Sequence, residues 1–386
     1  MSIEQVSVEM IFFFILYGIT GVVPLIAALY LLLRRGNAFA PDVTPPLRLC
    51  RWAAAFFAVT TLAHVWWMLF YFYSSDQHSV SYLVLAMVDC VLLFATFAGM
   101  LLAMLQDRRR PVWPALVAVI PFVAFAGAYI VYPNSLLEQI TVAYLVLLSL
   151  VFTAYMIFAI RQYGRWLNDN YADLENKKVW LCQAVALVCM LLFILYVLAT
   201  DMVFIWLIHI VELVLVGLLL WRVETLPLLA DISTEEEVGT ASAPNETAQV
   251  TSMPSATERL QESRSSLISN LDLAQIERLL AERCVDTQLY LQHDLTLLLL
   301  AHKLGTNRFY LSQYFSRQGI TYNTYINNLR INHFISRYQE AAAAGQPFIA
   351  QQLARESGYR SYSTFSLAFK KRTGQSVTAW IRETVQ

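Results

Sequence analysis

The 386-residue sequence predicts an all-α protein in two parts: a bundle of seven membrane-spanning helices, then a tandem pair of helix-turn-helix units in the cytoplasm. Three observations predict this fold class. They are a series of long apolar runs, a one-sided distribution of basic residues between those runs, and an internal repeat near the C-terminus. Hydrophobic residues make up 58% of the chain and its mean hydropathy is +0.51, so a large part of it suits lipid better than water.

Seven apolar runs occupy residues 1–222, and each approaches the ~20 residues that a helix needs to cross a bilayer core. The runs are apolar on all sides, whereas a surface helix of a soluble protein is apolar on one face. No ten-residue segments alternate between apolar and polar residues, which argues against a membrane barrel. The runs lie at approximately 10–33, 50–73, 80–105, 112–132, 136–160, 179–199 and 202–221.

The basic residues of this region follow only the odd-numbered runs, so all 12 fall on one side of the predicted membrane. The positive-inside rule places this side in the cytoplasm, with the N-terminus outside and the C-terminus inside. Such a topology requires an odd number of spans, and seven satisfies it. The 12 residues are Arg34, Arg35, Arg48, Arg51, Arg108, Arg109, Arg110, Arg161, Arg165, Lys177, Lys178 and Arg222.

Four ionisable residues lie at membrane depth: His64, Asp89, His209 and Glu212. His209 and Glu212 are three residues apart and therefore share one helical face. Ionisable groups inside a bilayer are costly and by default mark a functional site. We interpret them as a candidate site for a proton or an unknown signal molecule. The alternative is that they only form hydrogen bonds that hold the helices together, with aromatic residues such as Trp66 and Trp67 in packing or interfacial roles.

The third inner loop, "RQYGRWLNDNYADLENKKVW" at residues 161–180, is the longest loop in this part of the chain. Its charged stretch is either a contact surface for the cytoplasmic part of the protein or a solvated loop beside the sixth run. The sequence favours the solvated loop, because a charged run is usually exposed to water.

Charge divides the chain into three regions with formal net charges of 0 for residues 1–222, −7 for 223–285 and +6 for 286–386. Residues 223–256 are rich in Ser, Thr, Pro, Ala and Glu, which predicts a flexible acidic linker. A helical pattern resumes over 257–285. We interpret that segment either as a dimerisation helix, which would make the protein a homodimer, or as a helix packed on the next domain.

The basic C-terminal region contains two copies of one unit, at residues 298–319 and 351–374, offset by 53 to 55 positions. Each copy is predicted to form a helix, a tight turn and a second helix, with the first helices at about 295–303 and 348–356. Gly305 and Gly358 follow these helices, where a left-handed residue is easiest for glycine. Asn307 and Ser361 suit the N-caps of the second helices.

The second helix of each unit has one apolar face, carrying Leu311 with Phe315 and Phe365 with Phe369, which is predicted to pack inward. In a helix-turn-helix the N-terminal part of the second helix enters the DNA major groove, so the opposite face is the candidate reading face. Double-stranded DNA is therefore the predicted partner. The opposite faces carry Arg308, Phe309, Ser312 and Gln313 in the first copy, and Tyr362, Ser363, Ser366 and Leu367 in the second.

The two units are separated by a long predicted helix that Asn323 can cap and that Gly345 and Pro347 end. About 21 residues at ~1.5 Å each give roughly 31 Å, close to the ~34–36 Å of one DNA turn. Such a rod would hold two reading helices in successive major grooves. The residues predicted to contact phosphates are Arg317, Arg360, Lys370, Lys371 and Arg372.

From about Leu289 to Glu383 the chain resembles the AraC/XylS family of transcription regulators. The segments that carry the resemblance are "LTLLLLAHKLGTNRFYLSQYFSRQG", "YINNLRINHFISRYQE" and "IAQQLARESGYRSYSTFSLAFKKRTGQSVTAWI". The resemblance implies a DNA-binding module of two subdomains that contacts RNA polymerase, and a bacterial protein whose sensory part has been replaced by membrane spans. It implies base-reading roles for Arg308, Phe309, Ser312, Gln313, Tyr362, Ser363 and Ser366.

Two positions depart from the family pattern. Leu367 stands where the second reading helix often has Arg, which removes one expected contact to DNA. Ser376-Val377 replaces the common Ser-Pro near the end, a change expected to affect the last turn more than DNA contact. We therefore expect the first unit to contribute more to sequence choice than the second.

These observations predict a one-component transcription regulator in the bacterial cytoplasmic membrane, which senses a signal in its membrane part. The alternatives are a receptor or transporter-like protein with a regulatory tail, and a scaffold whose tail binds protein. The chain contains no phosphate-binding glycine loop, no zinc-protease HExxH and no calcium loop. Its five cysteines form no CxxC pair, so we predict no catalytic residues, no metal and no cofactor.

Overall fold

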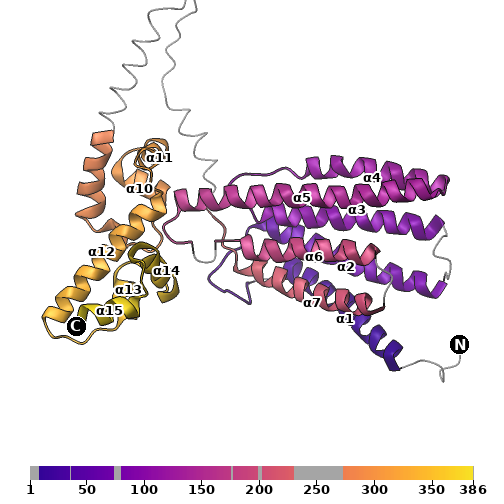
Figure 1. Cartoon of the computed structure of the whole chain (residues 1–386), viewed down its shortest axis with the longest axis horizontal. Helices are drawn as coiled ribbons and strands as arrows, with labels where there is room; N and C mark the ends of the chain where they lie inside the picture. The colour runs from indigo at the N-terminus through magenta and orange to yellow at the C-terminus, as the bar shows by residue number, and fades with distance from the viewer. Residues whose placement is uncertain are drawn as a thin grey trace, which may run out of the picture. The chain divides into compact units, whose positions relative to one another are not determined.

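The computed structural model describes residues 8–34, 36–73, 80–174, 177–198, 202–229 and 273–385. Within these residues all the regular elements are helices, and the only extended pairing is an isolated bridge between Tyr171 and Thr296 (Figure 1). The prediction of an all-α protein is therefore confirmed. The chain forms two compact units: unit 1 is Met1–Tyr163 with Asn176–Ala230, and unit 2 is Gly164–Glu175 with Asp231–Gln386.

Unit 1 is a bundle whose described helices match the seven predicted runs (Figure 1). Six of them are long and apolar enough to cross a membrane, whereas α6 has a shorter apolar stretch, Trp180–Leu192, among the described residues. The helices are α1 Val8–Leu33, α2 Leu47–Tyr73, α3 Val80–Ala103, α4 Trp113–Val131, α5 Ser135–Asn170, α6 Trp180–Leu198 and α7 Met202–Thr225.

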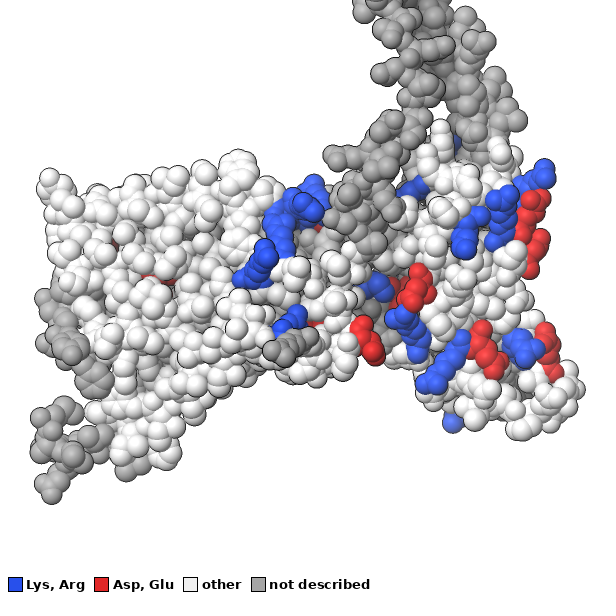
Figure 2. Space-filling model, turned by 180° about the vertical axis from the view of Figure 1, so that it is seen from behind, with Lys and Arg blue, Asp and Glu red and all other residues white. Residues whose placement is uncertain are grey.

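The outer surface of the bundle is apolar and its interior contains many small residues. Large side chains such as Ile26, Leu32 and Leu33 are exposed, while Ala53 and Ala98 are buried between helices. Small residues at helix contacts and apolar residues outside are the arrangement expected of helices packed in lipid. On the face that Figure 2 shows, the bundle has few charged residues along its length, and Lys and Arg gather at one end.

The loops that carry the basic residues contact one another at this end. Arg48 Nη2 donates to Arg110 O, Arg108 Nη2 donates to Gln162 Oε1 at 3.1 Å, and Arg222 Nη2 donates to Lys178 O at 2.7 Å. The basic residues in these contacts are among those that the sequence pattern places on one side of the membrane. Arg35 lies outside the described residues.

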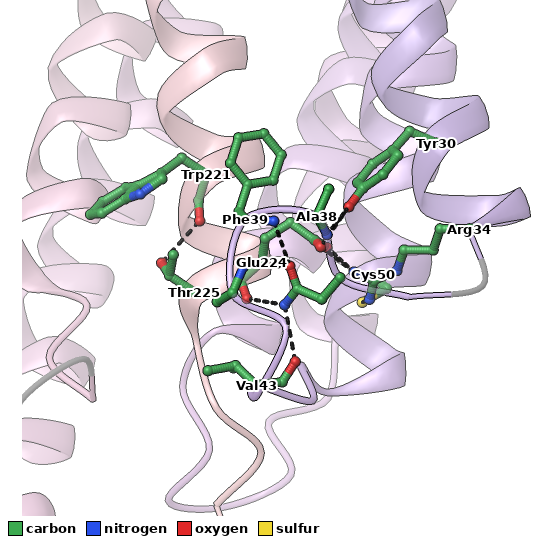
Figure 3. A network of polar contacts seen from close by, with 11 residues as sticks. Tyr30, Arg34, Ala38, Phe39, Val43, Cys50, Trp221, Glu224 and Thr225 are labelled. Carbon is green, nitrogen blue, oxygen red and sulfur yellow. Dashed lines mark hydrogen bonds and ion pairs between the residues drawn. The ribbon is translucent and has the colours of Figure 1, made fainter.

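A buried ion pair closes the same end of the bundle (Figure 3). Glu224, near the end of α7, is fully buried and pairs with Arg34, which follows α1. The Tyr30 hydroxyl donates to Glu224 Oε2 at 3.0 Å, and Asn37 Nδ2 donates to Glu224 O at 2.8 Å. A buried carboxylate needs such partners, because leaving it unpaired costs several kcal/mol. The first inner loop is thus held against the end of α7.

The predicted linker, which we began at residue 223, therefore starts inside the ordered bundle. Helix α7 runs to Thr225, and Leu226 and Leu229 are buried. Leu228 N donates to Thr44 O at 2.8 Å, and Leu229 N donates to Gln106 Oε1 at 2.9 Å. Residues 230–272, with the rest of the predicted linker and the first part of the predicted 257–285 helix, lie outside the described residues.

Unit 2 contains both predicted helix-turn-helix units, one on each side of the long helix α12 (Figure 1). Helices α10 and α11 form the first unit, and α13 and α14 form the second. Residues 273–280 are helical. The remaining elements are η2 Ala281–Val285, η3 Leu289–Leu291, α10 Leu297–Leu304, α11 Arg308–Arg317, α12 Tyr322–Ala343, α13 Ala350–Glu356, α14 Tyr362–Thr373 and α15 Val377–Val385.

The turns within each unit have the predicted chemistry. Asn307 Oδ1 accepts from Tyr310 N at 3.0 Å and Ser361 Oγ accepts from Thr364 N at 3.3 Å, so both are N-caps. Gly305 and Gly358 have φ of 73° and 89°, in the left-handed region. At Gly358 a side chain would also meet the backbone of Leu291, with a Cβ 2.8 Å from its carbonyl oxygen.

The predicted cap of α12 is wrong. Asn323 lies inside the helix, and Thr321 is the N-cap, with its hydroxyl accepting from Thr324 N at 3.2 Å. The physical reason is Tyr322, which is buried in the first core and donates from its hydroxyl to Leu295 O at 3.0 Å. Burying this ring fixes Tyr322 as the first helical residue, so Thr321 takes the extended cap position.

Helix α12 contributes to two separate hydrophobic cores. Tyr322 and Ile326 belong to the core of the first helix-turn-helix unit. Phe334 and Tyr338 belong to the core of the second helix-turn-helix unit. Between them lies the buried Arg330, whose Nε donates to Tyr290 O at 2.7 Å and whose Nη2 donates to Gln292 O at 2.6 Å. Its guanidinium carbon lies 5.6 Å from the centre of the Tyr359 ring. Burial lowers the pKa of Arg330.

Arg330→Ala should destabilise unit 2 by about 2–5 kcal/mol, because it removes a large buried side chain and the side-chain donor to the buried carbonyl of Tyr290. Native-state amide hydrogen exchange of α12 and α14 in the full chain would measure the change in opening free energy. Arg337→Ala, in the same helix but half-exposed and paired with Glu340, is the matched control and should stay within ~0.5 kcal/mol. Equal effects of the two variants would contradict this role of Arg330.

Candidate nucleic-acid interface and intramembrane cluster

The first reading helix, α11, separates its buried and exposed residues as predicted. Leu311, Tyr314 and Phe315 face the core, while Ser312 and Gln313 are exposed. Phe309 is 63% exposed although it is aromatic and not part of a core. An exposed aromatic beside polar side chains, at the N-terminal half of a second helix, is a surface suited to base edges and thymine methyl groups.

Arg308 is the first residue of this helix. Its side chain is half-buried and forms a hydrogen bond within the chain. Its Nε donates to Asn170 Oδ1 at 3.0 Å. Asn170 ends α5, and its part of the sequence, Gly164–Glu175, belongs to unit 2. The prediction that the third inner loop is merely solvated is therefore wrong for this part of the loop, and the alternative of a contact surface is confirmed.

The second reading helix, α14, offers a less polar surface. Phe365 and Phe369 are buried, Ser363 is exposed and Ser366 is half-buried. The ring of Tyr362 packs 5.7 Å from that of Phe365, so this predicted base-reading residue also belongs to the margin of the second core. Leu367 is 72% exposed at the centre of the outer face. The exposed face of α11 in the first helix-turn-helix unit therefore carries more polar side chains than the exposed face of α14.

The predicted phosphate-binding residues divide into two groups. Arg317, Lys370 and Lys371 are exposed near the C-terminal ends of the reading helices. Arg360 instead pairs with Asp294, while Arg372 donates to Asn328 O and Asn332 Oδ1. Arg360 and Arg372 are themselves exposed, so these contacts leave the prediction that they bind phosphates open.

The spacing of the two reading helices depends on α12. Its 22 residues give a rod of about 33 Å at ~1.5 Å per residue, close to one turn of duplex DNA. Because α12 packs in both cores of the DNA-binding domain, it holds the two helix-turn-helix units at a fixed separation. This geometry suits two neighbouring major grooves.

In unit 1 three of the four predicted intramembrane residues come together around Tyr17 of α1. His64 Nε2 of α2 lies 3.5 Å from Glu212 Oε2 of α7. The ring of His209 is 5.9 Å from that of His64, and the Tyr17 ring is 4.9 Å from His64 and 5.4 Å from His209. The Tyr17 hydroxyl donates to His64 O at 2.9 Å.

Asp89 of α3 is the fourth predicted member, and it is buried close enough to Glu212 for the two carboxylates to interact electrostatically. Trp67 Nε1 donates to Asp89 Oδ2 at 3.1 Å, so this tryptophan has a polar role beyond the packing role we expected. Asp89 Oδ1 and Glu212 Oε1 are buried without a hydrogen-bond partner among the described residues. We name Tyr17, His64, Trp67, Asp89, His209 and Glu212 the intramembrane cluster.

The family model of a helix-turn-helix domain, of the AraC type, matches residues 300–383. This range covers both reading helices and α12, so the C-terminal part of the chain is a DNA-binding domain of the kind found in transcription regulators. Among curated proteins and among solved structures, nothing matches the chain. The family match therefore characterises this domain, while the bundle is characterised by its geometry alone.

Gln313→Ala should change the sequence that the protein selects from a random duplex library, because Gln313 lies on the exposed reading face of α11. Loss of a base contact costs about 1–3 kcal/mol at one position. Gln318→Ala, at the C-terminal cap of the same helix and away from the groove-entering end, is the matched control and should leave the selected sequence unchanged. An unchanged selection for both variants would count against a reading role for Gln313.

Arg317→Ala should weaken binding to all duplexes by a similar factor, because a phosphate contact carries no sequence information. The slope of log affinity against log salt should fall by about one. Titrations of the full chain at four or five salt concentrations, with two unrelated duplexes, measure both quantities. A change in sequence preference with no change in salt slope would contradict the phosphate assignment.

Proposed function

We propose that this protein is a membrane-bound one-component transcription regulator that binds promoter DNA through unit 2 and senses a signal through unit 1. The observation that carries the proposal is the presence of two different parts in one chain. One is a tandem helix-turn-helix domain whose central helix, α12, is about as long as one turn of DNA. The other is a helical bundle with an apolar outer surface. The resemblance to AraC-type regulators supports contact with RNA polymerase and a bacterial origin.

In this proposal unit 1 lies in the cytoplasmic membrane with its N-terminus outside. The basic loops that meet at one end of the bundle support this orientation, because positively charged loops stay in the cytoplasm. The DNA-binding domain follows α7 and is then on the same side as the chromosome. The apolar outer surface of the bundle is covered by lipid.

The intramembrane cluster is the proposed signal site. It brings together side chains from α1, α2, α3 and α7, so occupation of the cluster can change how these helices pack. Two buried carboxylate oxygens have no hydrogen-bond partner in the described part of the chain, which favours a signal that supplies a proton or hydrogen-bond donors. A signal shifts the protein between two states only if it binds one of them more tightly.

Genome-wide occupancy of the full-length protein, compared with an Arg308→Ala variant, tests the proposed function. Wild-type protein should enrich a discrete set of promoter fragments, and the variant should lose or redistribute them. Purified full-length protein should bind the same fragments with an affinity that falls steeply with salt. No enrichment in any growth condition, with no salt-dependent binding in solution, would refute DNA regulation and favour a transporter-like protein with a protein-binding tail.

Glu212→Gln should abolish the dependence of target-promoter activity on growth conditions, because it replaces the carboxyl group beside His64 with an amide that cannot take up or release a proton. A reporter for an occupied promoter measures the response, and DNA titration of the purified variant should show that its binding is retained. Glu138→Gln, on the exposed first turn of α5, is the matched control and should respond like the wild type. A normal response of Glu212→Gln would remove the cluster from the sensing mechanism.

A further inference from the structure

The end of helix α5 is built into the DNA-binding unit. Residues Gly164–Glu175 belong to unit 2, and Ala172, only 2% exposed, is part of the core of the first helix-turn-helix unit. Asn170 and Tyr171 are also buried. We name residues 164–174 the α5 strap. Leu167 is buried as well, whereas Arg165 and Asp169 are exposed, so the strap has one buried side and one exposed side.

Polar contacts fix the α5 strap in place. Asn323 Nδ2 of α12 donates to Tyr171 O at 3.1 Å and to Ala172 O at 2.7 Å. Tyr171 forms the isolated bridge with Thr296, and Arg308 donates to Asn170 as described above. Burial raises the pKa of the Tyr171 hydroxyl to about 12, so the strap stays neutral at this position.

These contacts lie at the start of three helices of the DNA-binding domain. Thr296 is the N-cap of α10, Arg308 is the first residue of α11 and Asn323 is the second of α12. Helix N-termini attract phosphates, and the N-terminal part of the second helix is the part that enters the major groove. At Arg308 the α5 strap therefore contacts the helix end that DNA would be expected to approach.

The α5 strap carries Arg165, Asp169 and Asp173, a formal net charge of −1, while residues 286–386 have a formal net charge of +6. Asp173 lies close enough to Arg330 and Tyr359 to interact with both electrostatically. The attraction between Asp173 and Arg330 helps to hold the strap in place.

We propose that the first helix-turn-helix unit has an internal partner, the α5 strap, which competes with DNA for this surface. The inference rests on the proposed function, since it presumes that unit 2 binds DNA. The hydrogen bond from Nε to Asn170 fixes the direction of the Arg308 side chain, so displacement of the strap would let this residue reorient toward DNA. Helix α5 runs from Ser135 to Asn170, so the strap follows a membrane-spanning helix in the chain.

The test compares two asparagines of the strap in the full chain, embedded in lipid nanodiscs. Asn168 and Asn170 each donate to a carbonyl one turn earlier in α5, at 2.8 and 2.7 Å, but the contact to Arg308 involves Asn170. The probe is a random-sequence duplex of ~30 base pairs at ~50 mM salt, where phosphate contacts dominate binding. Asn170→Ala should tighten binding about fivefold, the effect of one hydrogen bond of ~1 kcal/mol in the closed state. Asn168→Ala should leave it unchanged.

Asn323→Ala is a second, independent variant, because it removes two of the hydrogen bonds to the strap backbone without altering the strap itself, while Asn327 keeps its own bond to Ala172 O. It should tighten binding at least as much as Asn170→Ala. Thermal unfolding of each variant establishes that unit 2 remains folded. Unchanged or weaker binding by both variants would overturn the inference and assign the strap a purely structural role. Failure of every protein, wild type included, to bind DNA would overturn the proposed function and this inference with it.

Discussion

The buried guanidinium of Arg330 is the interaction on which the DNA-binding unit depends. It lies in the middle of α12, between two cores that share no other helix, and it satisfies the carbonyls of Tyr290 and Gln292. With Tyr359 stacked against it, the same side chain contacts both helix-turn-helix units. Alignment of the two reading helices thus rests on one charge that is costly to bury and costlier to leave unpaired.

Local features of the fold could be predicted from the sequence because they depend on neighbouring residues. The apolar runs, the repeat offset and the caps at Asn307 and Ser361 all arise within a few turns of helix. The cap of α12 was predicted wrongly because Thr321 and Asn323 are both good caps. Choosing between them depends on the burial of Tyr322, which is decided by residues far away in the sequence.

The site could be predicted only in part, for the same reason. His64, Asp89, His209 and Glu212 were recognisable because an ionisable residue stands out in an apolar run. Tyr17 and Trp67 carry no such signal, since aromatic residues are common throughout these helices. The contact between Asn170 and Arg308 spans 138 positions, and no periodicity or motif indicates that the two residues are neighbours. Arg360 and Arg372 were predicted as phosphate contacts from their positions, while their contacts to Asp294 and Asn332 could not be predicted because those partners are 66 and 40 positions away.

The continuity of α5 has a consequence for how such a regulator would respond in a cell. Because the strap and the helix that it contacts belong to one chain, its release and return form a unimolecular equilibrium. The effective concentration of the strap at its binding surface is set by the chain and not by the amount of protein. The balance between the two states is then the same in a cell with ten copies as in one with a thousand, so its set point is independent of expression level.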